Sequence, residues 1–130
     1  LTSVSFPNVS SIGAYAFARC TRLTSVSFPN VSSIDFSAFY YCSSLTSVSF
    51  PNVSSIGACA FRYCYRLSSL TLRASTVCTL SNSNAFESTP FAGYSSYFSG
   101  MPHIYVPTSL LTSYKTATNW TYFSEYFVAI

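Results

Sequence analysis

A twelve-residue segment, LTSVSFPNVSSI, occurs three times without change, at residues 1–12, 23–34 and 45–56. The copies begin 22 residues apart, and Leu67 opens a fourth, imperfect copy at the same interval. Periods of about 20–29 residues are typical of solenoids, in which each repeat forms one coil stacked on the previous coil. This period constrains the possible folds more strongly than any other feature of the sequence.

Positions that are apolar and identical in all three copies mark the expected core. In Val4-Ser5-Phe6 apolar and polar residues alternate, which predicts a half-buried strand. Pro7 ends this strand because it has no N–H to donate to a neighbouring strand. Stacked coils then predict a parallel sheet with strands about 4.8 Å apart. The constant apolar positions of the first repeat are Leu1, Val4, Phe6, Val9, Ile12, Ala16, Phe17 and Cys20. The expected strands are residues 1–6, 23–28, 45–50, 67–72 and 103–106.

The rest of the coil and the fourth repeat are less regular. Residues 13–17 are short and rich in alanine, and they predict a single helical or 3₁₀ turn opposite the sheet. In the fourth repeat Cys78 falls in the isoleucine column, and the Ala85-Phe86 pair comes three residues late. A strand motif returns at 101–107, so one coil holds an insertion that includes the excursion at 87–100.

The C-terminal segment predicts a cap over the open end of the solenoid, as repeat arrays require. Thr108 or Ser109 can N-cap a helix over 109–117, and large apolar residues follow it. We therefore expect an α/β solenoid dominated by β structure and, because it starts directly on a repeat, a fragment of a longer protein. The expected organisation is one domain, 1–130, with regular repeats at 1–66, an irregular fourth repeat and last strand at 67–107, and the cap at 108–130.

Composition narrows the class of protein. Apolar residues make up 49% and aromatic residues 18% of the chain, which argues against disorder although only 7% of residues are charged. A net charge of +3, scattered along the sequence, does not indicate nucleic-acid binding. No apolar run reaches the length of about 18 residues that a membrane-spanning helix needs, so we expect no membrane span.

Three near-complete copies of one signature suggest a family. The pattern Leu-x-x-Val-x-Phe-Pro-x-x-Val-x-x-Ile-Gly-x-x-Ala-Phe-x-x-Cys-x-x fits 1–22, 23–44 and 45–66, except that Asp35 replaces the usual glycine. These repeats resemble the BspA-like leucine-rich repeats of bacterial surface proteins, and residues 104–120 are similar to a terminal segment found with them. The resemblance implies a leucine-rich repeat fold and a secreted or cell-wall-associated bacterial protein, in a family that contains adhesins.

The five cysteines allow two interpretations. Cys20, Cys42 and Cys64 share one column, so their Cα atoms are expected about 5 Å apart, within disulfide range. Stacked side chains point in parallel, however, which is unfavourable for a bridge, and free cysteine is among the most buried residue types. We expect a ladder of buried thiols, with a disulfide or a metal site as the alternative. Cys59 stands in a variable column and is expected to be the most exposed thiol.

Few residues suit catalysis. The chain has one histidine, His103, and three acids, Asp35, Glu87 and Glu125, which belong to different coils. The sequence contains no glycine-rich phosphate loop and no metal-ligand spacing. We therefore expect a protein that is not an enzyme, with no catalytic, cofactor-binding or metal-binding residue and no cofactor.

The variable windows 18–22, 40–44 and 62–66 hold four of the six basic residues, and tyrosines flank them. The 22-residue period places these windows on one side of the solenoid. Arginine and tyrosine are enriched at binding hot spots. The alternative is surface decoration, in which long side chains cover apolar neighbours. The candidate binding patch consists of Arg19, Arg22, Tyr40, Tyr41, Arg62, Tyr63, Tyr65 and Arg66.

The sequence thus favours an adhesion or binding module, with a host or neighbouring-cell protein or an anionic glycan as partner. The alternative is a structural spacer without a ligand of its own. The outward serines of the strands, such as Ser3 and Ser5, are uniform from repeat to repeat, which suits a spacer or a weak repetitive ligand. We expect a monomer, or copies paired through the open strand edge at 1–6.

Overall fold

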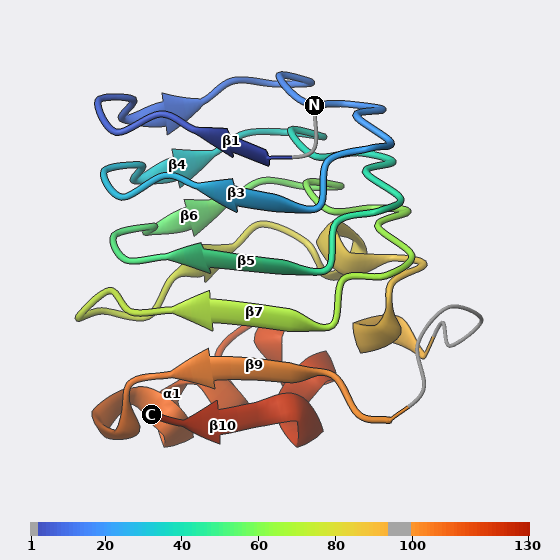
Figure 1. Cartoon of the computed structure of the whole chain (residues 1–130). Coiled ribbons are helices and arrows are strands. Elements are labelled where there is room, and N and C mark those ends of the chain that lie inside the picture. The colour runs from blue at the N-terminus through green and yellow to red at the C-terminus, as the bar shows by residue number, and fades with distance from the viewer. Residues whose placement is uncertain (1–2, 94–99) are drawn as a thin grey trace.

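The chain winds as a solenoid with two parallel sheets, and the computed structural model describes residues 3–93 and 100–130 (Figure 1). This confirms the predicted stack of coils. The larger sheet has the order β1 (Ser3–Ser5), β3 (Ser25–Ser27), β5 (Ser47–Phe50), β7 (Ser69–Leu72), β9 (His103–Val106) and β10 (Phe127–Ala129). The smaller sheet has the order β2 (Ser11–Ile12), β4 (Ser33–Ile34), β6 (Ser55–Ile56) and β8 (Thr79–Leu80). Residues 1–2 of the first expected strand lie outside the described residues.

The repeat sets the register of the larger sheet. Val26 pairs with Val4 on one side and with Val48 on the other, so each residue lies beside its own copies. In the irregular part, Leu70 pairs with Ile104, which confirms the 34-residue step that the returning strand motif predicts. Because successive residues of a strand face opposite sides, the apolar columns enter the core and the serine columns face solvent.

The smaller sheet is not predicted by the sequence, because each of its strands has only two residues. Its register follows the isoleucine column, in which Ile34 pairs with both Ile12 and Ile56. The column ends at Leu80, which pairs with Ile56, and the expectation that Cys78 occupies this column is wrong. Two additional residues between β7 and β8 move the next isoleucine-type position from 78 to 80.

The helical turn expected at residues 13–17 is also wrong for the three regular repeats, where this segment is a run of turns. Its backbone N–H groups alternate: those of Ala16 and Ala18 donate within their own coil, while those between and beside them donate to the next coil. The N–H of Tyr15 donates to the carbonyl of Phe36 at 3.1 Å, and that of Arg19 donates to the carbonyl of Tyr40 at 2.6 Å. The left-handed backbone of Tyr15 and Arg19, with φ values of 59° and 63°, keeps the segment aligned with its neighbour rather than coiled on itself.

A column of stacked rings runs through the core beside these turns. The ring centroids of Phe17, Phe39, Phe61 and Phe86 follow one another at 5.4, 5.2 and 5.6 Å. The N–H of Phe61 donates to the carbonyl of Ala85 at 2.8 Å, so the Ala85-Phe86 pair rejoins the column three residues late, as predicted. The core is therefore continuous from the regular repeats into the irregular one.

Short helices occur in the fourth repeat and in the C-terminal cap. They are η1 (Ser83–Phe86), η2 (Pro90–Ala92), η3 (Thr108–Leu110), α1 (Leu111–Thr116) and η4 (Trp120–Tyr126). The helix expected over 109–117 is confirmed as η3 followed by α1, whereas β10 is not predicted by the sequence. Within the described ranges, no helix has both the length and the apolar character needed to cross a membrane.

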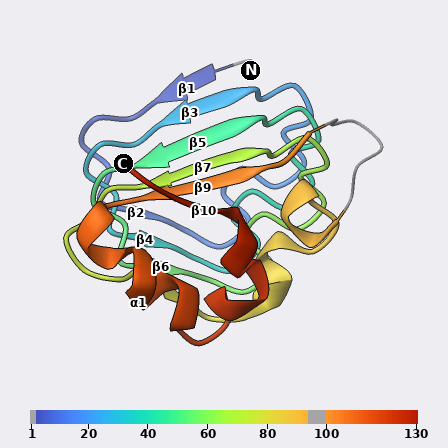
Figure 2. The same ribbon diagram turned by 90° about the horizontal axis from the view of Figure 1, so that it is seen from below.

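The cap closes the two sheets differently (Figure 2). The larger sheet continues through β9 into β10. The smaller sheet ends at β8, and side chains of the cap form hydrogen bonds with the backbone of this last coil. Cys78 donates its N–H to the hydroxyl of Tyr114 at 2.8 Å and accepts from the indole N–H of Trp120 at 2.7 Å. The side-chain amide of Asn119 donates to the carbonyl of Leu80 at 2.7 Å. These bonds fix the cap on the last coil of the smaller sheet.

A buried and an exposed position of one coil can test which side of the strands faces the core. Phe28 is buried and packs against Phe17 and Phe39, whereas Ser25 is exposed. We expect Phe28→Ala to lower the free energy of unfolding by about 3–5 kcal/mol because it opens a cavity. Ser25→Ala is expected to change it by less than about 0.5 kcal/mol. Urea denaturation measures both; similar losses would show that the strand faces are assigned incorrectly.

Two glycines of one column provide a second test. A Cβ atom at Gly57 would lie 2.8 Å from the backbone carbon of Asp35, while a Cβ at Gly13 would meet no atom within 4 Å. We expect Gly57→Ala to destabilise the protein by about 1–3 kcal/mol, because the neighbouring coil must move. Gly13→Ala is the matched control, and thermal denaturation should show no loss of stability for it. Equal losses of stability would mean that the close approach of the second and third coils does not restrict the side chain at position 57.

Candidate functional site

The candidate patch lies along the edge where each coil turns toward the larger sheet. Its three windows follow the turns and precede β3, β5 and β7 (Figure 1). Ring contacts join six of the eight predicted residues into one group, which we call the Arg/Tyr cluster. This cluster consists of Arg19, Tyr40, Tyr41, Arg62, Tyr63 and Tyr65.

Tyrosine rings form the centre of the cluster. The centroid of Tyr63 lies 5.5 Å from that of Tyr40, 5.8 Å from that of Tyr41 and 5.9 Å from that of Tyr65. The guanidinium of Arg19 lies over the ring of Tyr41, with Cζ 5.2 Å from the centroid. The rings are half-buried and Arg19 is exposed, so aromatic faces and a cation are presented together.

The backbone explains why these side chains meet. Arg19, Tyr41 and Tyr63 occupy one column, and all three have a left-handed backbone, with φ between 61° and 63°. This conformation is uncommon for residues other than glycine, and here bonds between coils hold it. The N–H of Tyr41 donates to the carbonyl of Arg62 at 2.8 Å, and that of Tyr63 donates to the carbonyl of Glu87 at 3.0 Å. Identical backbone geometry thus presents different side chains at the same corner.

Glu87 is a member of the site that sequence analysis missed. Its Oε2 atom lies 2.5 Å from Nε of Arg62, and the two side chains are 46% and 35% exposed. The Arg62 guanidinium also lies over the ring of Tyr63, with Cζ 4.8 Å from the centroid. The three-residue delay of the Ala85-Phe86 pair was the signal that Glu87 belongs to the column of Arg62 in the next coil. One of the basic charges of the cluster is therefore partly neutralised.

The other two predicted residues lie differently. Arg66 lines a hollow of about 220 Å³ together with Tyr41, Ser43 and Tyr65, so it adjoins the cluster. Arg22 is exposed and occupies the same column as Arg66 two coils away. Arg66 therefore adjoins the Arg/Tyr cluster, while Arg22 lies at the margin of the candidate patch.

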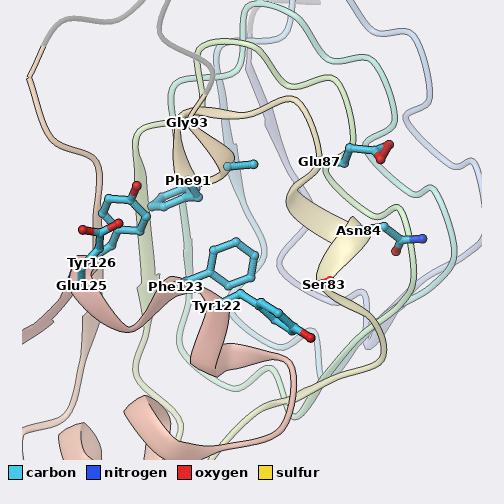
Figure 3. A pocket seen from close by; sticks show the side chains of 10 residues that line it. Ser83, Asn84, Glu87, Phe91, Gly93, Tyr122, Phe123, Glu125 and Tyr126 are labelled. Atoms are coloured by element: carbon cyan, nitrogen blue, oxygen red, sulfur yellow. The ribbon is translucent and has the colours of Figure 1, made fainter.

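A hollow separate from the Arg/Tyr cluster lies at the cap. Its volume is about 510 Å³, and it lies between η1, η2 and η4, with Phe91, Phe123 and Tyr126 among its lining residues (Figure 3). Glu87 and Glu125 also line it, but they lie at opposite sides and their carboxylates point apart (Figure 3). Because Glu87 is paired with Arg62, the hollow does not bring two free carboxylates together for acid–base chemistry.

His103 and the possible metal ligands can also be placed. His103 is half-buried on β9, and its ring centroid lies 5.8 Å from that of Tyr105 on the same face of the strand. In the residues that the structure describes, no three side chains of His, Cys, Asp or Glu gather in a way that could hold a metal ion.

The cysteine column forms the predicted ladder. The thiol of Cys42 donates to the carbonyl of Phe17, and that of Cys64 donates to the carbonyl of Phe39, both at 3.1 Å. Cys42 and Cys64 are fully buried, and burial raises the pKa of Cys64 well above its usual value. Cys20 is half-buried, and all five cysteines are free thiols.

The expectation that Cys59 is the most exposed thiol is wrong. Its exposed fraction is 8%, because the fourth coil covers it and its N–H donates to Oδ1 of Asn84 at 3.2 Å. Cys78, beneath the cap, is fully buried, and burial raises its pKa to about 12. Cys20 is therefore the most accessible thiol of the five.

Comparison with known proteins adds one finding. The family described as the BspA type leucine rich repeat region (6 copies) matches residues 1–99, which include the three regular repeats and most of the irregular one. No curated protein matches the sequence significantly.

Thiol labelling tests the burial of the cysteine column. We expect limited iodoacetamide treatment of the native protein to modify Cys20 first, because Cys42, Cys64 and Cys78 have no exposed surface and only the thiolate is nucleophilic. Peptide mapping by mass spectrometry identifies the modified residue, and labelling in urea shows that all five can react. Modification of Cys59 or Cys78 before Cys20 would contradict this order.

Proposed function

This chain belongs to the BspA-type leucine-rich repeat family, and we propose that it is a non-catalytic surface module that binds a macromolecular partner through the Arg/Tyr cluster. The observation that carries the proposal is the contact network of Arg19 with Tyr40 and Tyr41, which continues through Tyr63 to Arg62. These side chains come from three successive coils, so the solenoid assembles a surface that no single repeat contains.

The chemistry of the cluster supports a role in binding rather than in packing alone. Arginine and tyrosine dominate binding hot spots because they combine a large apolar surface with directed hydrogen bonds. The rings stabilise one another and hold the guanidinium of Arg19 in place, so less side-chain entropy is lost when a partner binds. Side chains that only cover apolar neighbours would not need these ring contacts between coils.

The charge of the cluster favours an acidic partner. Arg19 and Arg62 of the cluster and the adjoining Arg66 contribute three positive charges, and Glu87 compensates one of them. A protein with acidic groups or an anionic glycan, on a host or a neighbouring cell, complements this surface. The family's association with bacterial surface proteins agrees with a location at the cell surface, where such partners are encountered.

A structural spacer is the alternative function, and the uniform serine columns of the larger sheet favour it. Ser25 pairs with Ser3 and Ser47, so the outward face repeats the same hydroxyl from coil to coil. A spacer needs stiffness but no ligand. Pairing of two copies through β1, an outer strand of the larger sheet, is the alternative to a monomer.

The variant Arg19/Arg66→Ser tests the binding proposal. It removes two charges and retains Arg62, whose ion pair with Glu87 links two coils. The probes are immobilised sulfated glycosaminoglycans and acidic extracellular-matrix proteins, measured by surface plasmon resonance. For the probe that wild-type protein binds, we expect the variant to bind at least about tenfold more weakly, as loss of a hot-spot contact does. Binding should also weaken above physiological salt, where the screening length falls below about 8 Å.

The control is Arg73/Lys115→Ser, which removes the same number of charges elsewhere. Arg73 follows the end of β7, whereas the cluster precedes its start, and Lys115 lies in α1 of the cap. This control should bind as the wild type does. An equal loss in both variants would indicate attraction by net charge alone, and binding of no probe by the wild type would favour the spacer.

A further inference from the structure

A polar groove lies at another corner of the solenoid, along the smaller sheet. Its volume is about 280 Å³, slightly below the range of about 300–1,000 Å³ that is typical of sites for drug-sized ligands. The groove crosses successive coils, because the positions that line it recur from β2 to the segment after β8. The lining residues are Ser11, Ile12, Gly13, Ser33, Ile34, Asp35, Ser55, Gly57 and Ser81. Its size suits one small ring rather than a large cofactor.

The second repeat differs from its neighbours at this groove. The first and third repeats have Gly-Ala at 13–14 and 57–58, and the second has Asp35-Phe36. Both substituted residues are exposed, so packing in the core does not require them. Asp35 adds the only carboxylate of the three regular repeats, and Phe36 adds a large ring with 41% of its surface exposed.

The exposed ring of Phe36 is part of a pair. Its centroid lies 5.5 Å from that of Tyr15, in an edge-to-face arrangement, and Tyr15 is 57% exposed. Phe36 follows Asp35 directly in the chain and Tyr15 follows Gly13 by two residues, so both rings come just after residues that line the groove, which they do not line themselves. An exposed aromatic surface next to hydroxyl and carboxylate groups combines an apolar face with directed hydrogen bonds.

The polar groups of the groove are available to a ligand. One carboxylate oxygen of Asp35, Oδ1, accepts the N–H of Phe36 at 2.7 Å, which orients the side chain and leaves Oδ2 open. Ser33 and Ser55 line the groove beside Asp35 and are half-buried. A carboxylate accepts two hydroxyl donors, and serine both donates and accepts. The groove therefore offers complementary groups for a ligand that carries several hydroxyls.

The backbone beneath these groups is fixed on both sides. The N–H of Asp35 donates to the carbonyl of Ile12 at 2.9 Å, and the N–H of Gly57 donates to the carbonyl of Ile34 at 2.7 Å. The close approach of Gly57 to Asp35 further restricts this corner. A site on rigid backbone needs little reorganisation when a ligand binds.

We infer that this groove binds a neutral sugar ring of a polysaccharide, with Asp35 accepting sugar hydroxyls and the Phe36–Tyr15 pair contacting the apolar face of the ring. The single charge of the groove, on Asp35, is unfavourable for an anion. A divalent cation such as Ca²⁺ takes about six to eight oxygen ligands and favours several carboxylates, which the groove does not supply. The site is separate from the Arg/Tyr cluster, since no residue that lines the groove belongs to the cluster.

The double variant Asp35→Gly/Phe36→Ala tests the inference. It gives the second repeat the residues that the first and third repeats already have at the same positions, so the fold should tolerate it. The probes are cellohexaose, mannohexaose and chitohexaose, measured by isothermal titration calorimetry with the whole chain. We expect the wild type to bind at least one of these neutral hexasaccharides and the variant to bind it at least about tenfold more weakly. In an NMR titration, the amide signal of Phe36 should shift when that sugar binds.

Arg19/Arg66→Ser is the matched control, because it changes the other surface. It should bind the neutral sugar as the wild type does, so failure of the sugar site and failure of the Arg/Tyr cluster are distinguishable. Equal sugar binding by wild type and Asp35→Gly/Phe36→Ala would overturn the inference, as would the absence of binding to all three hexasaccharides. A sugar-induced shift confined to amides of the Arg/Tyr cluster would also overturn it.

Discussion

Backbone hydrogen bonds between coils hold this structure together, and they run along three sides of the solenoid. The larger sheet, the smaller sheet and the turn segment, where Arg19 donates to Tyr40, each bind a coil to the next. Buried N–H and carbonyl groups must be paired, and here many of the partners belong to a neighbouring coil. A single repeat therefore cannot satisfy its own backbone, which explains why near-identical repeats of constant length are required. It also explains the need for a cap, in which Tyr114, Asn119 and Trp120 provide the polar groups that a further coil would supply.

The same constraint decides where the sequence is free to vary. Columns that face the core or pair in the sheets keep their residues, since a change alters packing on two neighbouring coils. The corners carry the variation, because there the backbone is held by bonds that do not depend on the side chain. Arg19, Tyr41 and Tyr63 share one left-handed position with different side chains. The Arg/Tyr cluster and the groove at Asp35 both lie at such corners, and each combines residues from more than one coil.

The errors of the sequence-based predictions have a common physical cause. A helical turn was expected at 13–17 because short alanine-rich segments form local bonds, yet every second N–H there donates to the next coil. Cys59 was expected to be exposed because its column varies, yet the fourth coil covers it through Asn84. The isoleucine column was expected to continue to Cys78, but an insertion of two residues moved it to Leu80. In each case the deciding contact comes from a neighbouring coil.

The sequence alone determined the stacked parallel strands, their register, the phenylalanine and cysteine columns and the C-terminal helix. An exact repeat places each residue beside its own copies in the neighbouring coils, which fixes the strands, the register and the columns. It also identified the residue types of the candidate patch, since four arginines lie in two of the three variable windows and tyrosines take the position of Arg19 in the second and third windows. Only the tertiary structure decided which of these residues meet. It separated Arg22 from the cluster, brought Glu87 to Arg62, and placed Asp35 among the serines of the smaller sheet. The period fixes the distance between equivalent positions, whereas the direction of a side chain depends on the local backbone and on irregular coils that the period does not describe.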